Sequence, residues 1–352
     1  MINQEWNFAA RIIEWQTRHG RHDLPWQASR DPYRVWLSEI MLQQTQVVTV
    51  IGYFLRFVAR FPNLQALSEA PAGEVMAAWS GLGYYARARN LHACARLLVQ
   101  AHGGRFPEAP EAIAALPGIG RSTANAIAVF CFGARAAILD GNVKRVLCRH
   151  FGVEGYPGER EVEKRLWALA ESLLPQQGVA AYIQAQMDLG ASLCSRNRPN
   201  CLNCPVAASC RALAEGRTGL LPQKRPRRIL PERQIRVLLL VDSERVLLLQ
   251  RPPLGIWGGL LSLPEVPEGM EPLAYAASAL GCAVARFAAL PPLRHSFTHF
   301  HLTLQPLLGE VRLVPRLADA AGSCWLARDE LAQAALPTPI RSLLASHWLA
   351  PP

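Results

Sequence analysis

The sequence predicts a protein of two domains, an all-helical domain followed by an α+β domain. Apolar residues recur at helical spacing up to about residue 215, and short strand-like runs begin near residue 235. Between them lies a basic stretch rich in Gly and Pro, a composition typical of a linker. The chain has 352 residues, half of them apolar, which is enough for two hydrophobic cores.

Residues 1–215 are predicted to form helix after helix. One apolar stripe that approximates helical spacing comprises Leu91, Cys94, Ala95, Leu97 and Leu98. Proline-containing dipeptides such as Asp31-Pro32 mark the points where helices start and stop. This half shows no strand alternation, so we expect a purely helical domain.

Residues 216–234 combine Gly, Pro and many Arg and Lys without periodicity. This is the most basic stretch of the chain, so we expect a linker that lies along a phosphate backbone rather than floating free.

Residues 235–352 are predicted to form the α+β domain. Two aliphatic runs, 237–241 and 246–249, flank a turn-like Asp-Ser-Glu and indicate a β-hairpin, and 297–304 alternates like a strand. Residues 272–281 and 328–335 are expected to be helical.

The net charge of +10 favours a polyanionic partner, nucleic acid ahead of an anionic membrane, although a merely basic surface is the alternative. Residues 1–20 lack the apolar core of a signal peptide, and no run is long enough to span a membrane. We therefore expect a cytoplasmic, nucleoid-associated protein.

Four cysteines fall in one short polar loop with the spacing C-x6-C-x2-C-x5-C: Cys194, Cys201, Cys204 and Cys210. Four thiolates so close together can hold either Zn²⁺ or an iron–sulfur cluster. Disulfides are the competing interpretation, but nothing indicates an oxidising compartment. The loop has one C-x-x-C pair where zinc ribbons usually have two, which favours a [4Fe–4S] cluster without excluding zinc.

The segment Leu116-Pro117-Gly118-Ile119-Gly120 lies between two helical patterns. Gly118 and Gly120 permit a tight hairpin, and the helix that begins near Ser122 presents its positive end beside it. Such a helix–hairpin–helix can hold a DNA phosphate through backbone N–H groups. The alternative is an ordinary turn between helices.

Two carboxylates stand out as candidate catalytic groups. Glu39 is the only charged residue between Arg34 and Arg56, so it lies either at the surface or in a pocket that raises its pKa. Asp140 precedes a predicted helix, where it is either a simple N-cap or an anion that stabilises a developing cation.

Together these motifs resemble the endonuclease III superfamily of helix–hairpin–helix DNA glycosylases. The stretches SEIMLQQTQV, GLGYYARARNLH, LDGNVKRVL and QAQMDLGA are similar to adenine DNA glycosylases of the MutY type. In the second half, LGIWGGLLSLPE and LRHSFTHFHL resemble the Nudix-like C-terminal domain of that family. The resemblance implies base excision repair with base flipping, on double-stranded DNA that contains adenine opposite 8-oxoguanine or guanine, by a monomer with one [4Fe–4S] cluster.

The resemblance also implies roles for individual residues. Glu39 would protonate adenine, Asp140 would stabilise the oxocarbenium-like sugar, and Asn142 would orient water or the sugar. Gln184 would bind the edge of adenine, although outside this context it would be taken as a surface glutamine. The base opposite would be contacted by Leu42, Gln43, Tyr84, Thr298 and His299.

The chain departs from the pattern of its relatives at three places. Bifunctional relatives carry a Schiff-base lysine where this chain has Ser122, so hydrolysis without strand cleavage is expected. The R-E-x-x-E-E helix that holds Mg²⁺ in Nudix hydrolases is absent after Gly259, so we expect nucleotide recognition without hydrolysis. Thr298 replaces the serine of the family's Phe-Ser-His loop and retains its hydroxyl.

Two other functions compete with this prediction. One is a bifunctional endonuclease III-type glycosylase and AP lyase, against which Ser122 argues. Lys144 could react adventitiously with an abasic site, but it is assigned no catalytic role. The other is a non-enzymatic, zinc-dependent DNA-binding module.

Overall fold

The structure is a computed structural model that describes residues 2–226, 229–242, 244–253, 255–313 and 322–349. Parts of the expected linker, the hairpin turn and the LGIWGG motif fall on Arg227, Arg228, Ser243 and Leu254, which lie outside the described residues. The chain divides into two compact units. The helical unit comprises Met1–Ser68 and Ala93–Arg227, and the sheet unit comprises Glu69–His92 and Arg228–Pro352.

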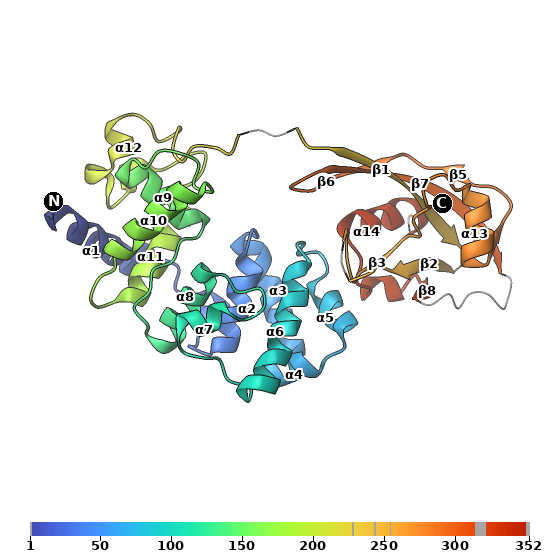
Figure 1. Cartoon of the computed structure of the whole chain (residues 1–352), viewed down its shortest axis with the longest axis horizontal. Coiled ribbons are helices and arrows are strands. Elements are labelled where there is room, and N and C mark those ends of the chain that lie inside the picture. Colours follow the sequence, from blue (N-terminus) through green and yellow to red (C-terminus); the bar gives the residue numbers. More distant parts are fainter. Residues whose placement is uncertain (1, 227–228, 243, 254, 314–321, 350–352) are drawn as a thin grey trace. The chain divides into compact units, whose positions relative to one another are not determined.

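Among residues 2–226 every assigned element is a helix (Figure 1). The helical unit contains α1 (Ile2–His19), η1 (Pro25–Gln27), α2 (Pro32–Leu42), α3 (Val47–Arg60), α7 (Pro110–Ala114), α8 (Arg121–Phe132), α9 (Gly141–Phe151), α10 (Arg160–Ser172), α11 (Val179–Ser192), η2 (Cys201–Asn203), η3 (Ala207–Ser209) and α12 (Arg211–Ala214). Two helices, α4 (Leu64–Glu69) and α6 (Ala86–His102), extend into the sheet unit, which also holds α5 (Ala72–Trp79). No helix in the described part of the chain is both long enough and apolar enough to cross a membrane.

Side-chain caps fix where the helices that carry the site begin. Asp31 accepts a hydrogen bond from the Tyr33 N–H at 3.0 Å, and Pro32 opens α2. Asp140 caps α9 in the same way, by accepting from the Val143 N–H at 2.7 Å. Because both caps are set by local sequence, the first turns of α2 and α9 have defined starting points.

The core of the helical unit is formed by α1, α8, α9, α10 and α11, which bury residues such as Ile12, Val143, Leu147, Leu166 and Ile183. α9 and α11 pack so closely that a Cβ on Gly190 would lie 2.6 Å from the Cβ of Asn142. Gly190 therefore permits the close approach that brings the first turn of α9 against α11.

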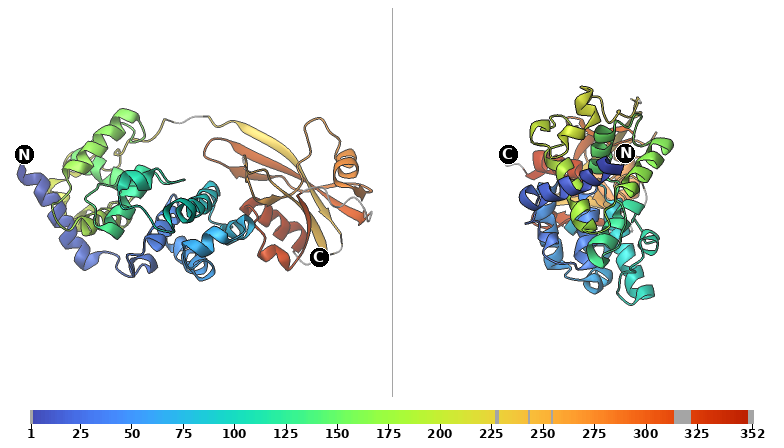
Figure 2. Two further views of the ribbon diagram at one scale, coloured as in Figure 1. Left: turned by 60° about the horizontal axis from the view of Figure 1, so that its bottom comes forward. Right: turned by 90° about the vertical axis from the view of Figure 1, so that its left-hand side faces the viewer.

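The sheet unit contains an eight-stranded sheet. Its strands are β1 (Glu232–Val241), β2 (Arg245–Gln250), β3 (Leu261–Ser262), β4 (Cys282–Val284), β5 (Ala288–Ala289), β6 (Leu293–Ser296), β7 (His301–Leu313) and β8 (Ser323–Ala327). The main path runs β3-β2-β1-β7-β4, while β5 and β6 pair with β7, and β8 pairs with β2. β1 and β7 are parallel, from Glu232 beside His301 to Val241 beside Glu310, and their long pair is visible in Figure 2.

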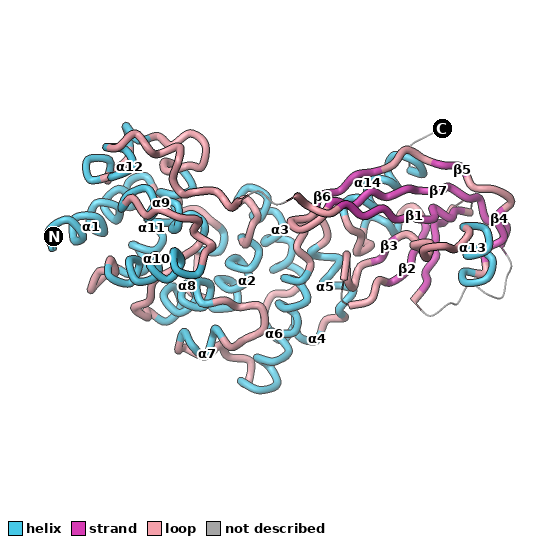
Figure 3. The backbone as a smooth tube through the Cα atoms, turned by 45° about the horizontal axis from the view of Figure 1, so that its top comes forward, coloured by secondary structure: helices cyan, strands magenta, loops and turns pink. Residues whose placement is uncertain are grey.

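The helical elements of the second half are α13 (Pro272–Leu280), η4 (Glu330–Ala332), α14 (Thr338–Leu344) and η5 (Ala345–Leu349). α13 closes a small core with Leu238, Leu240, Leu247 and Val266. Figure 3 shows the strands confined to this unit.

The predicted fold class is confirmed, including the β1–β2 hairpin and the helix at 272–280. Two local predictions were only partly right: of the strand expected over 297–304, residues 301–304 lie in β7. Residues 297–300 form a turn before β7, because the Phe297 N–H donates to the Phe300 carbonyl at 2.9 Å and so closes the chain on itself. Residues 328–335 contain only a short 3₁₀ helix, which the Asp329 side chain caps.

The unit boundaries also differ from the expected ones. β1 begins at Glu232, within the stretch assigned to the linker, because its pairing with β7 starts there. Residues 69–92, expected in the first domain, group with the sheet unit.

Candidate active site

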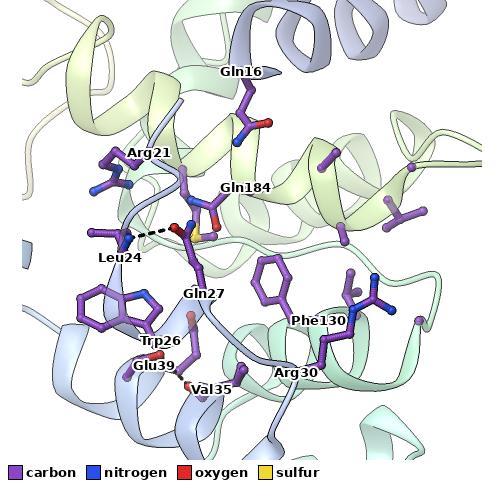
Figure 4. A pocket seen from close by; sticks show the side chains of 18 of the residues that line it. Gln16, Arg21, Leu24, Trp26, Gln27, Arg30, Val35, Glu39, Phe130 and Gln184 are labelled. Carbon is purple, nitrogen blue, oxygen red and sulfur yellow. Dashed lines mark hydrogen bonds between the residues drawn. The ribbon is translucent and has the colours of Figure 1, made fainter. Parts of the chain in front are cut away.

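The helical unit encloses a cavity of about 650 Å³ that holds the first candidate carboxylate. Its walls come from the segment before α2, from α2 itself, from the end of α8 and from the start of α11. Figure 4 shows Glu39 and Gln184 reaching the cavity from different helices, with Trp26 and Gln27 beside them. The cavity is therefore assembled from segments that are distant in the sequence.

Glu39 is held in surroundings that favour its neutral form. It is half-buried on α2, between the buried residues Ser38 and Ile40. Desolvation by the surrounding protein raises the pKa of Glu39 to about 7, and the nearby charge of Asp140 contributes in the same direction. At neutral pH the carboxyl is thus poised to give or take a proton.

Asp140 is the N-cap of α9, and it also lies near Glu39. Its Oδ1 accepts from the Val143 N–H, so it is a true N-cap, and its charge is close enough to act on Glu39. Burial raises the pKa of Asp140, while the N–H groups of Val143 and Asn142 and the charge of Arg145 oppose that rise. The two carboxylates are therefore neighbours, although about a hundred residues separate them in the chain.

Asp140 opens onto a second space, a groove of about 1350 Å³. Asn142 and Gln43 line this groove as well, and Leu42 lines both the groove and the cavity. Leu42 is thus a wall of both spaces, and each space is lined by one of the two carboxylates.

Gln184 is oriented by an ion pair between buried Asp188 and partly exposed Arg21. Its Nε2 donates to Asp188 Oδ1 at 2.9 Å, and Asp188, only 2 % exposed, also accepts from the Arg21 Nε at 2.7 Å and from the Arg21 backbone N–H at 3.0 Å. Since an ionised carboxylate only accepts, the amide nitrogen of Gln184 must face Asp188. Its carbonyl oxygen is then directed elsewhere, as an acceptor.

Asn142 is held by Arg145. The Arg145 Nη2 donates to Asn142 Oδ1 at 2.8 Å and to the Gly190 carbonyl at 2.7 Å, while its Nε donates to the Cys194 carbonyl at 2.8 Å. One guanidinium therefore links the first turn of α9 to the cysteine loop.

The hairpin between α7 and α8 has the expected form. Gly118 has a φ of 76°, which glycine adopts readily, and Gly120 is the N-cap of α8. The Ser122 Oγ accepts from the Leu139 N–H at 3.0 Å and so ties α8 to the residue before Asp140.

The four loop cysteines lie close enough together that a charge on one raises the pKa of its neighbours. Buried Arg149 braces the loop: its Nη1 lies 3.4 Å from the Cys194 Sγ and 2.7 Å from the Ser195 carbonyl, and its Nη2 donates to the Arg196 carbonyl at 3.0 Å. Within the described residues, no three His, Cys, Asp or Glu side chains are arranged to hold a metal ion. The donor set, four thiols beside a guanidinium, suits a cofactor that binds thiolates.

In the sheet unit, Tyr84 lies in a strained loop between α5 and α6. It is 48 % exposed with a φ of 49°, which is unfavourable for a bulky residue. Buried Arg87 donates to the carbonyls of Leu82 and Gly83 at 3.2 and 3.1 Å, and the Trp79 Nε1 donates to the Gly83 carbonyl at 3.2 Å. These bonds hold the loop in a conformation that keeps Tyr84 exposed.

Thr298 and His299 are exposed at the tip of the turn between β6 and β7. Phe297 and Phe300 stack beneath them at 4.5 Å between ring centroids, and Trp257 lies 6.1 Å from Phe297. The turn thus packs aromatic rings against one another and presents a hydroxyl and an imidazole to solvent.

Several residues that shape the cavity were not predicted from the sequence. Trp26, Gln27 and Arg21 line it from the segment before α2, and Asp188 orients Gln184 from within α11. The dipeptide Leu24-Pro25, which opens η1, was a local signal of a turn, but nothing in the sequence shows that the turn faces Glu39.

Comparison with known proteins defines the class. Residues 37–172 match the model of the HhH-GPD superfamily of base excision DNA repair proteins, and residues 236–346 match the NUDIX domain. The structure of a thermostable thymine-DNA glycosylase superposes with a TM-score of 0.56 at 30 % identity, over 60 % of this chain and 98 % of that one. These matches define the class as a base-excision-repair DNA glycosylase, an enzyme that hydrolyses N-glycosidic bonds.

Relatives along nearly the whole chain define the family. The adenine DNA glycosylase of Buchnera aphidicola is 34 % identical over 96 % of this chain and 95 % of its own. The adenine DNA glycosylase of Homo sapiens is also 34 % identical, over 96 % of this chain and 73 % of its own. The chain belongs to the adenine DNA glycosylase family, of the MutY type.

Proposed function

We propose that the protein excises adenine paired with 8-oxoguanine or guanine in double-stranded DNA and does not cleave the strand. The observation that carries this proposal is the placement of Glu39 and Asp140. One carboxyl, with a pKa raised to about 7, lines a cavity large enough for a base, and the other borders the adjoining groove. This division suits a flipped purine in the cavity and its sugar at the cavity mouth.

Glu39 is the proton donor and Asp140 the counter-ion. As the bond between C1′ and the purine nitrogen breaks, Glu39 gives its proton to a ring nitrogen of adenine, and the base takes the bonding electron pair. Asp140 stabilises the resulting cationic sugar. Water then adds its oxygen to C1′, and its proton returns to the Glu39 carboxylate. Asn142, oriented by Arg145, positions this water or the sugar.

Gln184 selects adenine. With its amide nitrogen committed to Asp188, its carbonyl oxygen accepts from the exocyclic amino group of adenine. A guanine edge would present a carbonyl oxygen at the corresponding place, so the two acceptors would repel each other.

Recognition of the opposite base is assigned to residues of both units. Leu42 and Gln43 wedge into the duplex from the end of α2, Tyr84 contacts the base from its strained loop, and Thr298 and His299 contact it from the β6–β7 turn. Support comes from the exposure of Tyr84, Thr298 and His299, in loops that hydrogen bonds or packed aromatic rings hold in place. Because side chains that read a base must reach it, exposure on a fixed support suits this role.

Other residues hold the DNA backbone and a cofactor. Gly118, Gly120 and Ser122 bind a phosphate at the hairpin. Cys194, Cys201, Cys204 and Cys210 hold a [4Fe–4S] cluster, with Zn²⁺ as the alternative metal. When bound, the cluster cross-links the loop and supports its charged surface, and no step of base excision passes through it.

The test is a glycosylase assay with purified protein and duplexes that carry adenine opposite 8-oxoguanine, guanine or thymine. We expect excision opposite the first two and little opposite thymine. Borohydride is added to a parallel reaction on an abasic duplex, where efficient covalent trapping would instead support a bifunctional lyase. Equal excision opposite all three bases would contradict the proposed recognition.

A further inference from the structure

The groove that contains Asp140 has one wall made by the beginning of the predicted linker. Gly219 and residues 221–225 line it, together with residues of α9, the end of α2 and the loop 43–46. The first residues of the linker are therefore part of the groove wall. The basic side chains of Lys224 and Arg225 line the same groove as Asp140.

This wall is anchored to the helical unit. The Nε of Arg149 donates to the carbonyl of buried Leu221 at 2.8 Å, and the Leu221 N–H donates to the Arg217 carbonyl at 3.1 Å. Arg217 in turn pairs with Glu154 at 2.5 Å. Since Arg149 also braces the cysteine loop, the linker segment and that loop share one support.

The groove is strongly basic. Its lining residues include one carboxylate, Asp140, and six cations, Lys144, Arg145, Arg149, Arg196, Lys224 and Arg225. Three of the cations have internal partners: Lys144 pairs with Glu163 at 2.5 Å, and Arg145 and Arg149 donate to loop carbonyls. Arg196, Lys224 and Arg225 are exposed, so their charges face solvent in the groove.

We propose that Lys224 and Arg225 bind backbone phosphates of the DNA strand that carries the excised adenine. This inference rests on the proposed function, which places the target sugar at Asp140. The phosphates on either side of that sugar are covalently attached to it, so they must enter the same groove. A single anion among cations suits such a strand, because the cations meet the phosphates while Asp140 meets the sugar as it becomes positive.

The contact carries affinity without sequence preference. Lys224 and Arg225 belong to an exposed segment without regular structure, and long flexible cations that bind phosphate read no base. The linker would then fix the strand beside the site in addition to connecting the two units.

The test compares two double variants with the same change of charge. Lys224→Ala/Arg225→Ala removes the proposed contacts, and Lys164→Ala/Arg165→Ala removes two exposed cations of α10 that line neither the cavity nor the groove. Binding of full-length protein to an unmodified duplex is measured as a function of salt. Losing two phosphate contacts should reduce the magnitude of the slope of log K against log salt by about 1.8 and weaken binding on the order of tenfold at about 0.15 M salt.

A third variant, Lys224→Arg/Arg225→Lys, keeps the charges and should keep the wild-type slope. If the first double variant behaves like the α10 control, with both folded by circular dichroism, the proposal is overturned. Binding of an unmodified duplex requires no excision, so this outcome is distinguishable from failure of the adenine assay with the wild-type protein.

The strand assignment has its own test. Neutral methylphosphonate linkages are placed on either side of an adenine opposite 8-oxoguanine, in a duplex whose target nucleotide is fluorinated at C2′ to prevent cleavage. Neutralisation should weaken binding of the wild-type protein and have little further effect on Lys224→Ala/Arg225→Ala. Fully additive losses would show that these residues contact other phosphates, which would overturn the assignment to this strand.

Discussion

The cavity of the helical unit and the β6–β7 turn of the sheet unit differ in how far they expose their candidate side chains to water. The cavity surrounds Glu39 with protein and raises its pKa, whereas the turn leaves Thr298 and His299 exposed above stacked phenylalanine rings. Proton transfer requires a pKa near the working pH, and burial supplies it. A side chain that recognises a base must contact it, and an exposed side chain is accessible for that contact. In the proposed function, proton transfer thus depends on burial of a side chain, whereas recognition of the opposite base depends on exposure.

The largest expected effect comes from replacing Glu39 with Gln, which keeps the shape of the side chain but removes its proton. Excision should slow by about 10² to 10⁴ in single-turnover assays, the usual contribution of a general acid, while binding to the mispaired duplex persists. Glu14→Gln, an exposed glutamate of α1, is the matched control and should excise normally. Wild-type rates in Glu39→Gln would remove Glu39 from the mechanism.

The same substitution should stabilise the fold at alkaline pH. Because the pKa of Glu39 is raised from 4.5 to about 7 in the folded protein, ionisation penalises the folded state increasingly as the pH rises from about 4.5 to 7. Removing the charge should therefore increase the free energy of unfolding at pH 8 by about 3 kcal/mol, and much less at pH 5. Urea denaturation at both pH values measures this, and a destabilised Glu39→Gln at pH 8 would contradict burial of the charge.

The pH profile of excision should follow Glu39. The active form is protonated, so the single-turnover rate should fall about tenfold per pH unit above a pKa of about 7. At acidic pH the rate should also fall, because Asp140, whose pKa is raised by burial, must be ionised to stabilise the sugar. A rate that is constant from pH 6 to 9 would show that no group with this pKa donates the proton.

The smallest effect is expected at the exposed turn. Thr298→Ala removes a hydroxyl from a solvated surface, so the preference for 8-oxoguanine over guanine should fall only about two- to tenfold. Thr298→Ser retains the hydroxyl and should keep the preference. Equal losses in both variants would assign the effect to the methyl group or to the turn conformation, and would count against hydrogen bonding.

Local signals predicted the parts of the molecule that depend on local chemistry. Nearby residues determine the caps of α2 and α9, the glycine hairpin and the β1–β2 turn. The juxtaposition of Glu39 and Asp140 was expected only through resemblance to a family. Spacing alone could not place them together, because tertiary packing of α2 against α8 and α9 against α11 decides it.

The features of the site that the sequence did not predict depend on contacts between residues far apart in the chain. Asp188 orients Gln184 only because Arg21, far away in the sequence, completes the ion pair. Three non-glycine residues in the described part of the chain have positive φ, namely Gln44, Tyr84 and Trp257. Each lies in or beside a segment assigned to the opposite base, and strain of this kind is set by surrounding structure rather than by local preference.

The division of the sheet unit into two separate stretches has a consequence for synthesis on the ribosome. The Ser80 hydroxyl donates to the Leu336 carbonyl at 2.9 Å, and the Arg89 guanidinium donates to the Gly258 carbonyl at 2.7 Å. During translation, Glu69–His92 emerges long before these acceptors exist, so its polar groups must remain hydrated until the C-terminal residues follow. In a nascent chain that stalls in the linker, residues 69–92 would still lack the carbonyl acceptors of Gly258 and Leu336.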